Sequence, residues 1–276
     1  MDTDQPLTPD LIDRHTFWCL AMELTPSAVE VMLTSTVEDN SLIYRRIPLP
    51  ADIPAPHRAL EEVIYRNPLL LSDFRSTHII LRPRHWAAIP DTVDPADTSA
   101  ILWPDAAADN LSPLICPLKP FSAAALAMTD RSSLGLLRRT FSDAAISVHM
   151  QPLCSFITSG TRNSGVTKAF VNLGPESVDL IIYSGQRLQY INTFEVTDPS
   201  DAAYYILAAV EATSFDRMNH QMLISGPPSR REALMPLLRK YINYVMPQIF
   251  PAAALRSGRE AMDAPFELTV LPLIRN

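Results

Sequence analysis

The sequence has little glycine, little cysteine and a deficit of positive charge. Seven glycines and three cysteines occur in 276 residues, and the formal net charge is −7. The three cysteines lie far apart and form no C-x-x-C pair, which indicates neither a disulfide framework nor a zinc site. The acidic balance disfavours nucleic acid as a partner, because nucleic-acid-binding proteins normally carry a basic face.

Long hydrophobic runs are also missing. The longest, Ala202 to Val210, is far shorter than the ~20 residues that span a membrane. The segment from Met1 to Arg14 is polar and has no apolar core of a secretory signal. We therefore expect a cytoplasmic protein with no membrane span.

Hydrophobic and proline residues are plentiful. Hydrophobic residues make up 47% of the chain and charged residues 19%, which is typical of a globular protein. Many of the 25 prolines crowd between Pro83 and Pro120, and we expect irregular structure there.

An internal repeat is the most informative pattern. The segment Leu24 to Leu33 aligns without a gap with Leu173 to Ile182: Leu, Pro and Val recur, an acid follows the Val, and an apolar run closes both. The surrounding pattern repeats as well, so the two segments belong to a larger duplicated unit.

Each copy is predicted to run β-β-β-α-β-α. In the first copy we expect strands at 17–24, 28–36, 42–47 and 77–81 and helices at 57–66 and 134–141. In the second we expect strands at 167–173, 177–183, 187–194 and 222–225 and helices at 202–213 and 230–245. Asp198 and Pro199 have the residue types of a helix N-cap and first helical position.

The sequence thus predicts an α/β protein of mixed sheets, with two ribonuclease-H-like units in two lobes. We place the first lobe at residues 1–150, including the Pro-rich region 83–120, and the second at 151–276.

This duplicated unit resembles the plan of the actin, sugar-kinase and heat-shock-chaperone ATPase superfamily. From Phe17 to about Val245 the chain is also similar to the bacterial family called domain of unknown function 3822 (DUF3822). The segments that carry this similarity are Leu188–Phe194, Asp201–Leu207, Leu223–Gly226, Leu238–Ile242 and Phe141 with Ala145, Ile146 and His149. The resemblance implies an actin-like ATPase fold and no known reaction.

The superfamily resemblance also implies where a nucleotide would bind. In that superfamily each β1–β2 hairpin cradles phosphates through backbone N–H groups, and an Asp in each helps to hold Mg²⁺. Here Glu23 stands at the first Asp position and Asn172 at the second, with Thr25, Gly174 and Ser177 in the hairpins. Gly226 lies in a strand-to-helix turn that resembles the adenosine-contacting loop.

This nucleotide site looks degenerate. Pro26 and Pro175 have no N–H to offer, so each hairpin loses a donor. Asn172 has no charge for a metal, and Glu23 and Asp179 are best interpreted as exposed acids at strand ends. We assign no catalytic residue and no metal ligand. We regard a set of six residues as a vestigial cofactor site: Glu23, Thr25, Asn172, Gly174, Ser177 and Gly226.

Other chemistries find less support. The fourth strands carry no acid, which disfavours a ribonuclease-H-like nuclease. The six histidines show no i,i+3 or i,i+4 pairing, and His149 is interpreted as structural. The run Gly160 to Gly165 lacks the ending of a P-loop and is predicted to be a flexible connector.

Two hypotheses remain. The first is a non-catalytic interaction or scaffold protein, a pseudo-ATPase that needs no cofactor and binds unidentified protein partners, as a homo-oligomer or within an accessory complex. The alternative is a nucleotide-binding ATPase or kinase that uses ATP and Mg²⁺ through unconventional phosphate contacts. One fold hosts many functions, so the fold does not decide between them.

Overall fold

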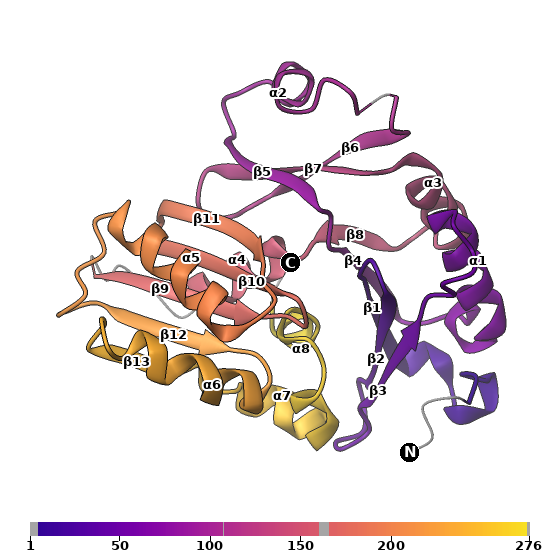
Figure 1. Ribbon diagram of the computed structural model, residues 1–276. Helices are drawn as coiled ribbons and strands as arrows, with labels where there is room; N and C mark the ends of the chain where they lie inside the picture. Colours follow the sequence, from indigo (N-terminus) through magenta and orange to yellow (C-terminus); the bar gives the residue numbers. More distant parts are fainter. Residues whose placement is uncertain (1–4, 107, 160–165, 275–276) are drawn as a thin grey trace.

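The computed structural model describes residues 5–106, 108–159 and 166–274. These residues form two five-stranded sheets and a smaller three-stranded sheet, with helices packed around them (Figure 1). The predicted connector Gly160 to Gly165 lies outside the described residues. Short 3-10 helices occupy Pro9–Leu11, His15–Phe17, Pro68–Leu71, Arg259–Met262 and Leu271–Leu273.

The first large sheet has the strand order β3-β2-β1-β4-β8. Its strands are β1 (Trp18–Leu24), β2 (Ala28–Ser35), β3 (Ile43–Pro48), β4 (Ser76–Leu81) and β8 (Ala145–Val148). β1, β2 and β3 pair antiparallel, and β4 and β8 continue the sheet in parallel. The amphipathic helices α1 (Pro56–Arg66) and α3 (Arg131–Thr140) bury their apolar residues in the same core as alternate residues of these strands.

The second large sheet repeats this order as β11-β10-β9-β12-β13. Its strands are β9 (Thr167–Leu173), β10 (Ser177–Ser184), β11 (Arg187–Glu195), β12 (Gln221–Ser225) and β13 (Tyr244–Pro247). Helices α5 (Pro199–Glu211) and α6 (Pro228–Leu238) share its apolar core. The predicted start of α5 is confirmed, because the Asp198 carboxylate accepts hydrogen bonds from the N–H groups of Ser200 and Asp201 at 2.6 and 3.1 Å.

The repeat is longer than predicted. Each copy has a fifth strand, β8 in the first and β13 in the second, that extends its sheet in parallel. The predicted helix 230–245 was therefore wrong in its second half: α6 ends at Leu238, and β13 begins at Tyr244. A strand of only four residues carries too short a pattern to be separated from the end of an amphipathic helix.

The prediction of irregular structure between Pro83 and Pro120 was also wrong. This region forms β5 (His85–Pro90), α2 (Pro95–Leu102) and β6 (Leu111–Pro117), and the two strands flank β7 (Ala123–Asp130) in the order β5-β7-β6. Its prolines fit because they lie at permissive places. Pro90 ends an edge strand, Pro113 and Pro117 lie on the other edge strand, and Pro95 begins a helix. The central strand β7 contains no proline.

Helices cross between the two copies of the unit. Helix α4 (Met150–Ser159), which follows the first copy, shares a core with Phe170 and Ile181 of the second sheet. Helices α7 (Ala252–Ser257) and α8 (Phe266–Val270) follow the second copy, and Leu268 of α8 packs with Ala21 and Ile80 of the first sheet. Figure 1 shows α8 in the space between β10 and β1.

No helix among the described residues is long and apolar enough to cross a membrane. The lobe boundary at residue 150 stays a prediction.

Candidate functional site

The two hairpins β1–β2 and β9–β10 meet at a single guanidinium group. Arg82 directly follows β4, and its Nε donates a hydrogen bond to Glu23 Oε1 of β1 at 2.8 Å. Its Nη1 donates to both oxygens of Asp179 in β10 at 3.2 Å. Its Nη2 pairs with the carboxylate of Glu267 in α8. Each nitrogen of this guanidinium thus contacts a carboxylate, and the three carboxylates come from three separate parts of the chain.

This cluster is buried. The Arg82 side chain is 10% exposed, Glu23 is 1% exposed and Asp179 is 0% exposed. The interpretation of Glu23 and Asp179 as exposed acids at strand ends was therefore wrong. Strand position alone misled it, because the facing surfaces of two packed units cover both hairpins.

Mutual compensation of charge dominates the ionisation of the cluster. Burial alone would raise the pKa of Asp179, but the charge of Arg82, helped by His149, holds that pKa well below its ordinary value. Burial alone would lower the pKa of Arg82, yet Asp179 and Glu23 raise it above its ordinary value. Arg82 is therefore a fixed positive charge that holds Asp179 in its ionised form.

Neutral side chains add hydrogen bonds to Asp179 and Glu267, whereas the buried Glu23 Oε2 has no hydrogen-bond partner among the described residues. Asn172 Nδ2 donates to Asp179 Oδ2 at 3.0 Å and to Glu267 Oε2 at 3.1 Å, and Asn172 Oδ1 accepts from Ser225 Oγ at 2.8 Å. Thr193 Oγ1 donates to Asp179 Oδ1 at 2.8 Å. Asn172 thus works as a neutral donor between two acids, a role that a carboxylate at this position would not perform.

His149 lies at the edge of the same network. It is fully buried, and its Nε2 lies 2.9 Å from Thr193 Oγ1 and 3.3 Å from Asp179 Oδ1. Its ring packs edge-on against Trp86 of β5, with centroids 5.8 Å apart. His149 therefore links the inserted three-stranded sheet to the hairpin acids.

A second buried acid lies beside Glu23. Glu30 of β2 accepts from the Tyr44 hydroxyl at 2.7 Å and from Arg46 Nη1 at 2.6 Å. Burial raises the pKa of Glu30, although Tyr44 and Arg46 oppose this shift. Burial and the neighbouring Glu30 raise the pKa of Tyr44 as well.

The predicted site residues do come together here, but with structural contacts of their own. Thr25 closes its hairpin turn, because its Oγ1 donates to Ala28 O and accepts from Ala28 N, both at 3.0 Å. Ser177 Oγ accepts from Arg82 Nη1 at 3.4 Å. A Cβ on Gly174 would lie 2.7 Å from Ser177 Oγ.

Gly226 is required by the backbone. Its φ is +107°, and a Cβ there would lie 2.6 Å from Leu173 O and 2.7 Å from Leu173 Cβ. The glycine thus allows the β12–α6 turn to approach the end of β9 closely. This packing explains the residue without any ligand.

A small cavity of about 220 Å³ remains beside the cluster. Glu23, Thr25, Gly174 and Gly226 line it together with Arg82, and α8 closes it through residues such as Phe266 and Glu267. Within the described residues no group of three or more His, Cys, Asp or Glu side chains is placed to hold a metal ion.

Sequence reasoning missed Arg82 and Glu267, the residues that organise the site. Arg82 gave a readable signal, since a charged residue directly after a buried parallel strand lies at the sheet edge where sites form. Glu267 gave none, because α8 lies beyond the repeat and its contact with Arg82 spans 185 positions.

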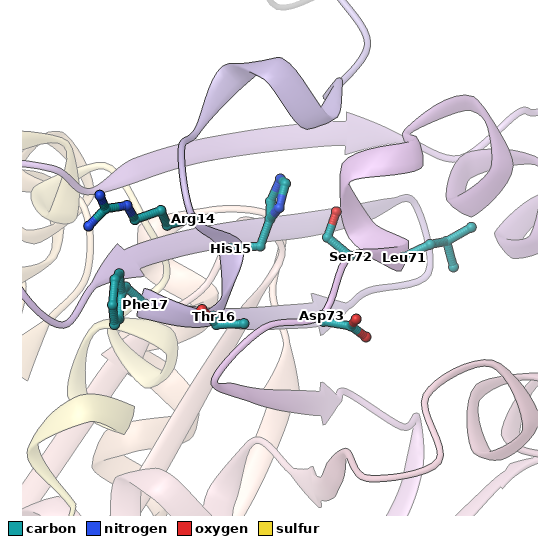
Figure 2. A pocket seen from close by; sticks show the side chains of 7 residues that line it. All are labelled: Arg14, His15, Thr16, Phe17, Leu71, Ser72 and Asp73. Carbon is teal, nitrogen blue, oxygen red and sulfur yellow. The ribbon is translucent and has the colours of Figure 1, made fainter.

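Two larger hollows lie elsewhere. One, of about 710 Å³, is lined by residues that include Arg14, His15 and Leu71, and Figure 2 shows these side chains pointing apart rather than converging. The other, of about 830 Å³, contains His78, whose Nε2 lies 3.0 Å from Ser147 Oγ. Ser147 is only 2% exposed, so its hydroxyl is not presented to a substrate as a nucleophile would be.

Known proteins support the same architecture. A crystal structure from Bacteroides thetaiotaomicron, described as a protein with actin-like ATPase fold and unknown function, matches with a TM-score of 0.74 and 16% identity, over 90% of this chain and 95% of that chain. A structure of the PilM–PilN type IV pilus biogenesis complex matches with a TM-score of 0.54 and 12% identity, over 94% of this chain and 99% of that one. A comparison with curated protein sequences finds no match.

The family model described as "Protein of unknown function (DUF3822)" matches residues 10–245, and α7 and α8 lie beyond that match. The predicted actin-like fold and family are both confirmed: the chain belongs to the DUF3822 family and has the actin-like ATPase fold.

Proposed function

We propose that this protein is a non-catalytic interaction protein in which an internal ion-pair cluster takes the place of a nucleotide. The observation that carries the proposal is the position of Arg82 between Glu23 and Asp179. Glu23 and Asp179 belong to the two hairpins that would otherwise cradle phosphates. A guanidinium already compensated by three carboxylates has no free positive charge for a phosphate.

The remaining space and donors agree with this proposal. The cavity of about 220 Å³ is smaller than the ~300 Å³ at the lower end of pockets for drug-sized ligands. Pro175 supplies no N–H in its hairpin, and the carboxylates of Glu23 and Glu267 at the cavity would repel a phosphate. The acids that could serve Mg²⁺ are engaged with Arg82, so the residues present do not fit ATP with Mg²⁺.

A protein-binding role is compatible with the fold, since PilM occurs in a complex with PilN. The three free cysteines fit a reducing compartment, and we propose the cytoplasm. A homo-oligomer also remains a proposal, and light scattering of the purified protein measures it.

Isothermal titration calorimetry of the protein with ATP, with and without Mg²⁺, tests whether the protein binds a nucleotide. We expect no heat of binding and no change in melting temperature at millimolar ATP. Binding with a micromolar Kd, about −8 kcal/mol, would overturn the proposal and favour the ATPase or kinase alternative. Substitution of Gly226 is a poor control for this experiment because its contact with Leu173 is structural.

Met262→Trp is a better control if binding is seen. Met262 lines the cavity, is exposed and takes no part in the ion-pair cluster. A bulky side chain there would fill the space and abolish binding at this site, whereas binding elsewhere would persist.

A further inference from the structure

The inserted three-stranded sheet carries an apolar surface that nothing in the described chain covers. We call it the α2 surface and define it by Val93, Ile101, Leu102 and Ile115. Ile101 is 79% exposed, and the other three are between 41% and 47% exposed. Ile115 of β6 pairs with Leu126 of β7, so the two share a face of the sheet, and Trp103 at the end of α2 packs on the cluster that contains Leu126.

Helix α2 is unusual because none of its eight residues is buried. A helix this short is marginal without packing. Its ends hold it instead: Asp94 Oδ1 accepts from Ala96 N at 2.7 Å, Pro95 occupies the first turn, and Trp103 anchors the far end. Ile101 and Leu102 are therefore not needed for the core and remain available for a contact.

The charge around this surface has one sign. Between Trp86 and Leu118 the sequence holds five aspartates and no Lys or Arg, so this segment carries most of the net charge of −7. The five are Asp91, Asp94, Asp97, Asp105 and Asp109, and all are exposed. No salt bridge joins any of them to a basic side chain in the part of the chain that the structure describes.

We propose that the α2 surface docks a basic amphipathic segment of a partner protein, whose apolar face covers Ile101 and Leu102 and whose Lys or Arg side chains meet the aspartates. Exposed apolar side chains supply the area for burial, and unpaired aspartates select positive charge and steer the encounter. Phosphate-rich partners such as nucleic acids and anionic membranes are repelled by the same charge. The proposal rests on the proposed role as an interaction protein, but the ATP titration tests that role separately, so the two can fail independently.

The test uses a fluorescein-labelled synthetic peptide of leucine and lysine, arranged with helical periodicity, and fluorescence anisotropy with the full chain. A peptide with glutamate in place of every lysine is the comparator. We expect the leucine–lysine peptide to bind, more weakly as salt increases, and the leucine–glutamate peptide not to bind. Absence of binding by the leucine–lysine peptide, or equal binding of both peptides, overturns the proposal.

Two double variants separate the apolar and charge contributions. I101S/L102S should weaken the Kd by about tenfold or more, because both side chains would be buried by the peptide. D97N/D105N should weaken the Kd by roughly three- to tenfold and flatten its salt dependence. Asp94 is left intact because it caps α2. All changed side chains are exposed, and an unchanged melting temperature verifies folding.

Matched controls are Y204S and E232Q, which alter an exposed tyrosine of α5 and an exposed glutamate of α6. Both should bind the peptide as the unaltered protein does, and an equal loss in controls and test variants overturns the proposal. Two further outcomes reassign the surface and also overturn it. One is a dimer in light scattering that I101S/L102S makes monomeric, which points to a second copy. The other is binding to phosphatidylglycerol vesicles that depends on Ile101.

Discussion

Replacing Arg82 by Met tests the reasoning about the buried cluster most directly. The substitution keeps the length of the side chain but removes the charge that compensates Glu23, Asp179 and Glu267. Breaking a buried ion pair by removing one partner costs about 3–5 kcal/mol. Three carboxylates lose their partner here, so we expect R82M to lower the free energy of unfolding at pH 7 by at least about 3 kcal/mol.

The pH dependence identifies the cause of this loss. Without Arg82, burial disfavours the ionised form of these carboxyl groups, so their pKa values in the folded state rise above those in the unfolded chain. The variant then binds more protons when folded, and it gains stability as pH falls toward about 4. In the unaltered protein the folded-state pKa of Asp179 is lowered. The stability that Asp179 contributes is therefore fully present at pH values above its unfolded-state pKa, and it is lost as the pH falls through the folded-state pKa. The gap between the two proteins should therefore narrow on acidification.

Urea unfolding followed by circular dichroism at pH 7 and pH 4.5 measures both effects. R82M/E267Q is the partner variant, because it removes one of the uncompensated charges and should recover part of the lost stability. R82K keeps the positive charge but loses the forked donors of the guanidinium, so its free energy of unfolding should lie between those of R82M and the unaltered protein. A loss below about 1 kcal/mol in R82M at pH 7, or a gap that does not depend on pH, refutes the account of the cluster.

Two further predictions concern glycine and cysteine. G226A should lower the free energy of unfolding in urea by about 1–3 kcal/mol, because the new Cβ would meet fixed backbone at a residue with positive φ. G174A should cost less, because its Cβ would meet the Ser177 hydroxyl, which can rotate away, and equal costs for the two variants would contradict this explanation. Iodoacetamide should alkylate half-buried Cys19 in the native protein and leave Cys116 and Cys154 unmodified until the protein unfolds, as mass spectrometry would show. The reason is that burial raises the pKa of the Cys116 and Cys154 thiols. Rapid modification of Cys154 in the native protein would contradict the packing of α4.

Local patterns in the sequence were enough to predict most elements of the repeat. The bounds of β9 were predicted without error at Thr167–Leu173, and the N-cap of α5 was predicted at Asp198. These features depend on alternation and on capping chemistry, which a single segment carries by itself. The inserted sheet was missed because proline frequency does not reveal whether a strand lies at an edge.

The candidate site was predicted only in part, for a physical reason. Glu23, Asn172 and Gly174 were named because the two hairpins resemble the phosphate-binding hairpins of the actin-like ATPase superfamily. Their burial, and the contacts of both hairpins with Arg82, depend on how the two copies pack, and local sequence patterns do not specify that packing. The degenerate phosphate cradle stays a prediction, while the charge of Arg82 between the two hairpins emerged from the structure alone.

The contact between Arg82 and Glu267 also constrains how the protein folds during synthesis. Since 185 positions separate these residues, the first sheet and both hairpins leave the ribosome before the third carboxylate of the cluster exists. Until residue 267 emerges, the inner face of the first sheet lacks Leu268, and Ala21 and Ile80 are open to solvent or to chaperones. The buried cluster and this part of the core therefore cannot be complete until α8 has been synthesised.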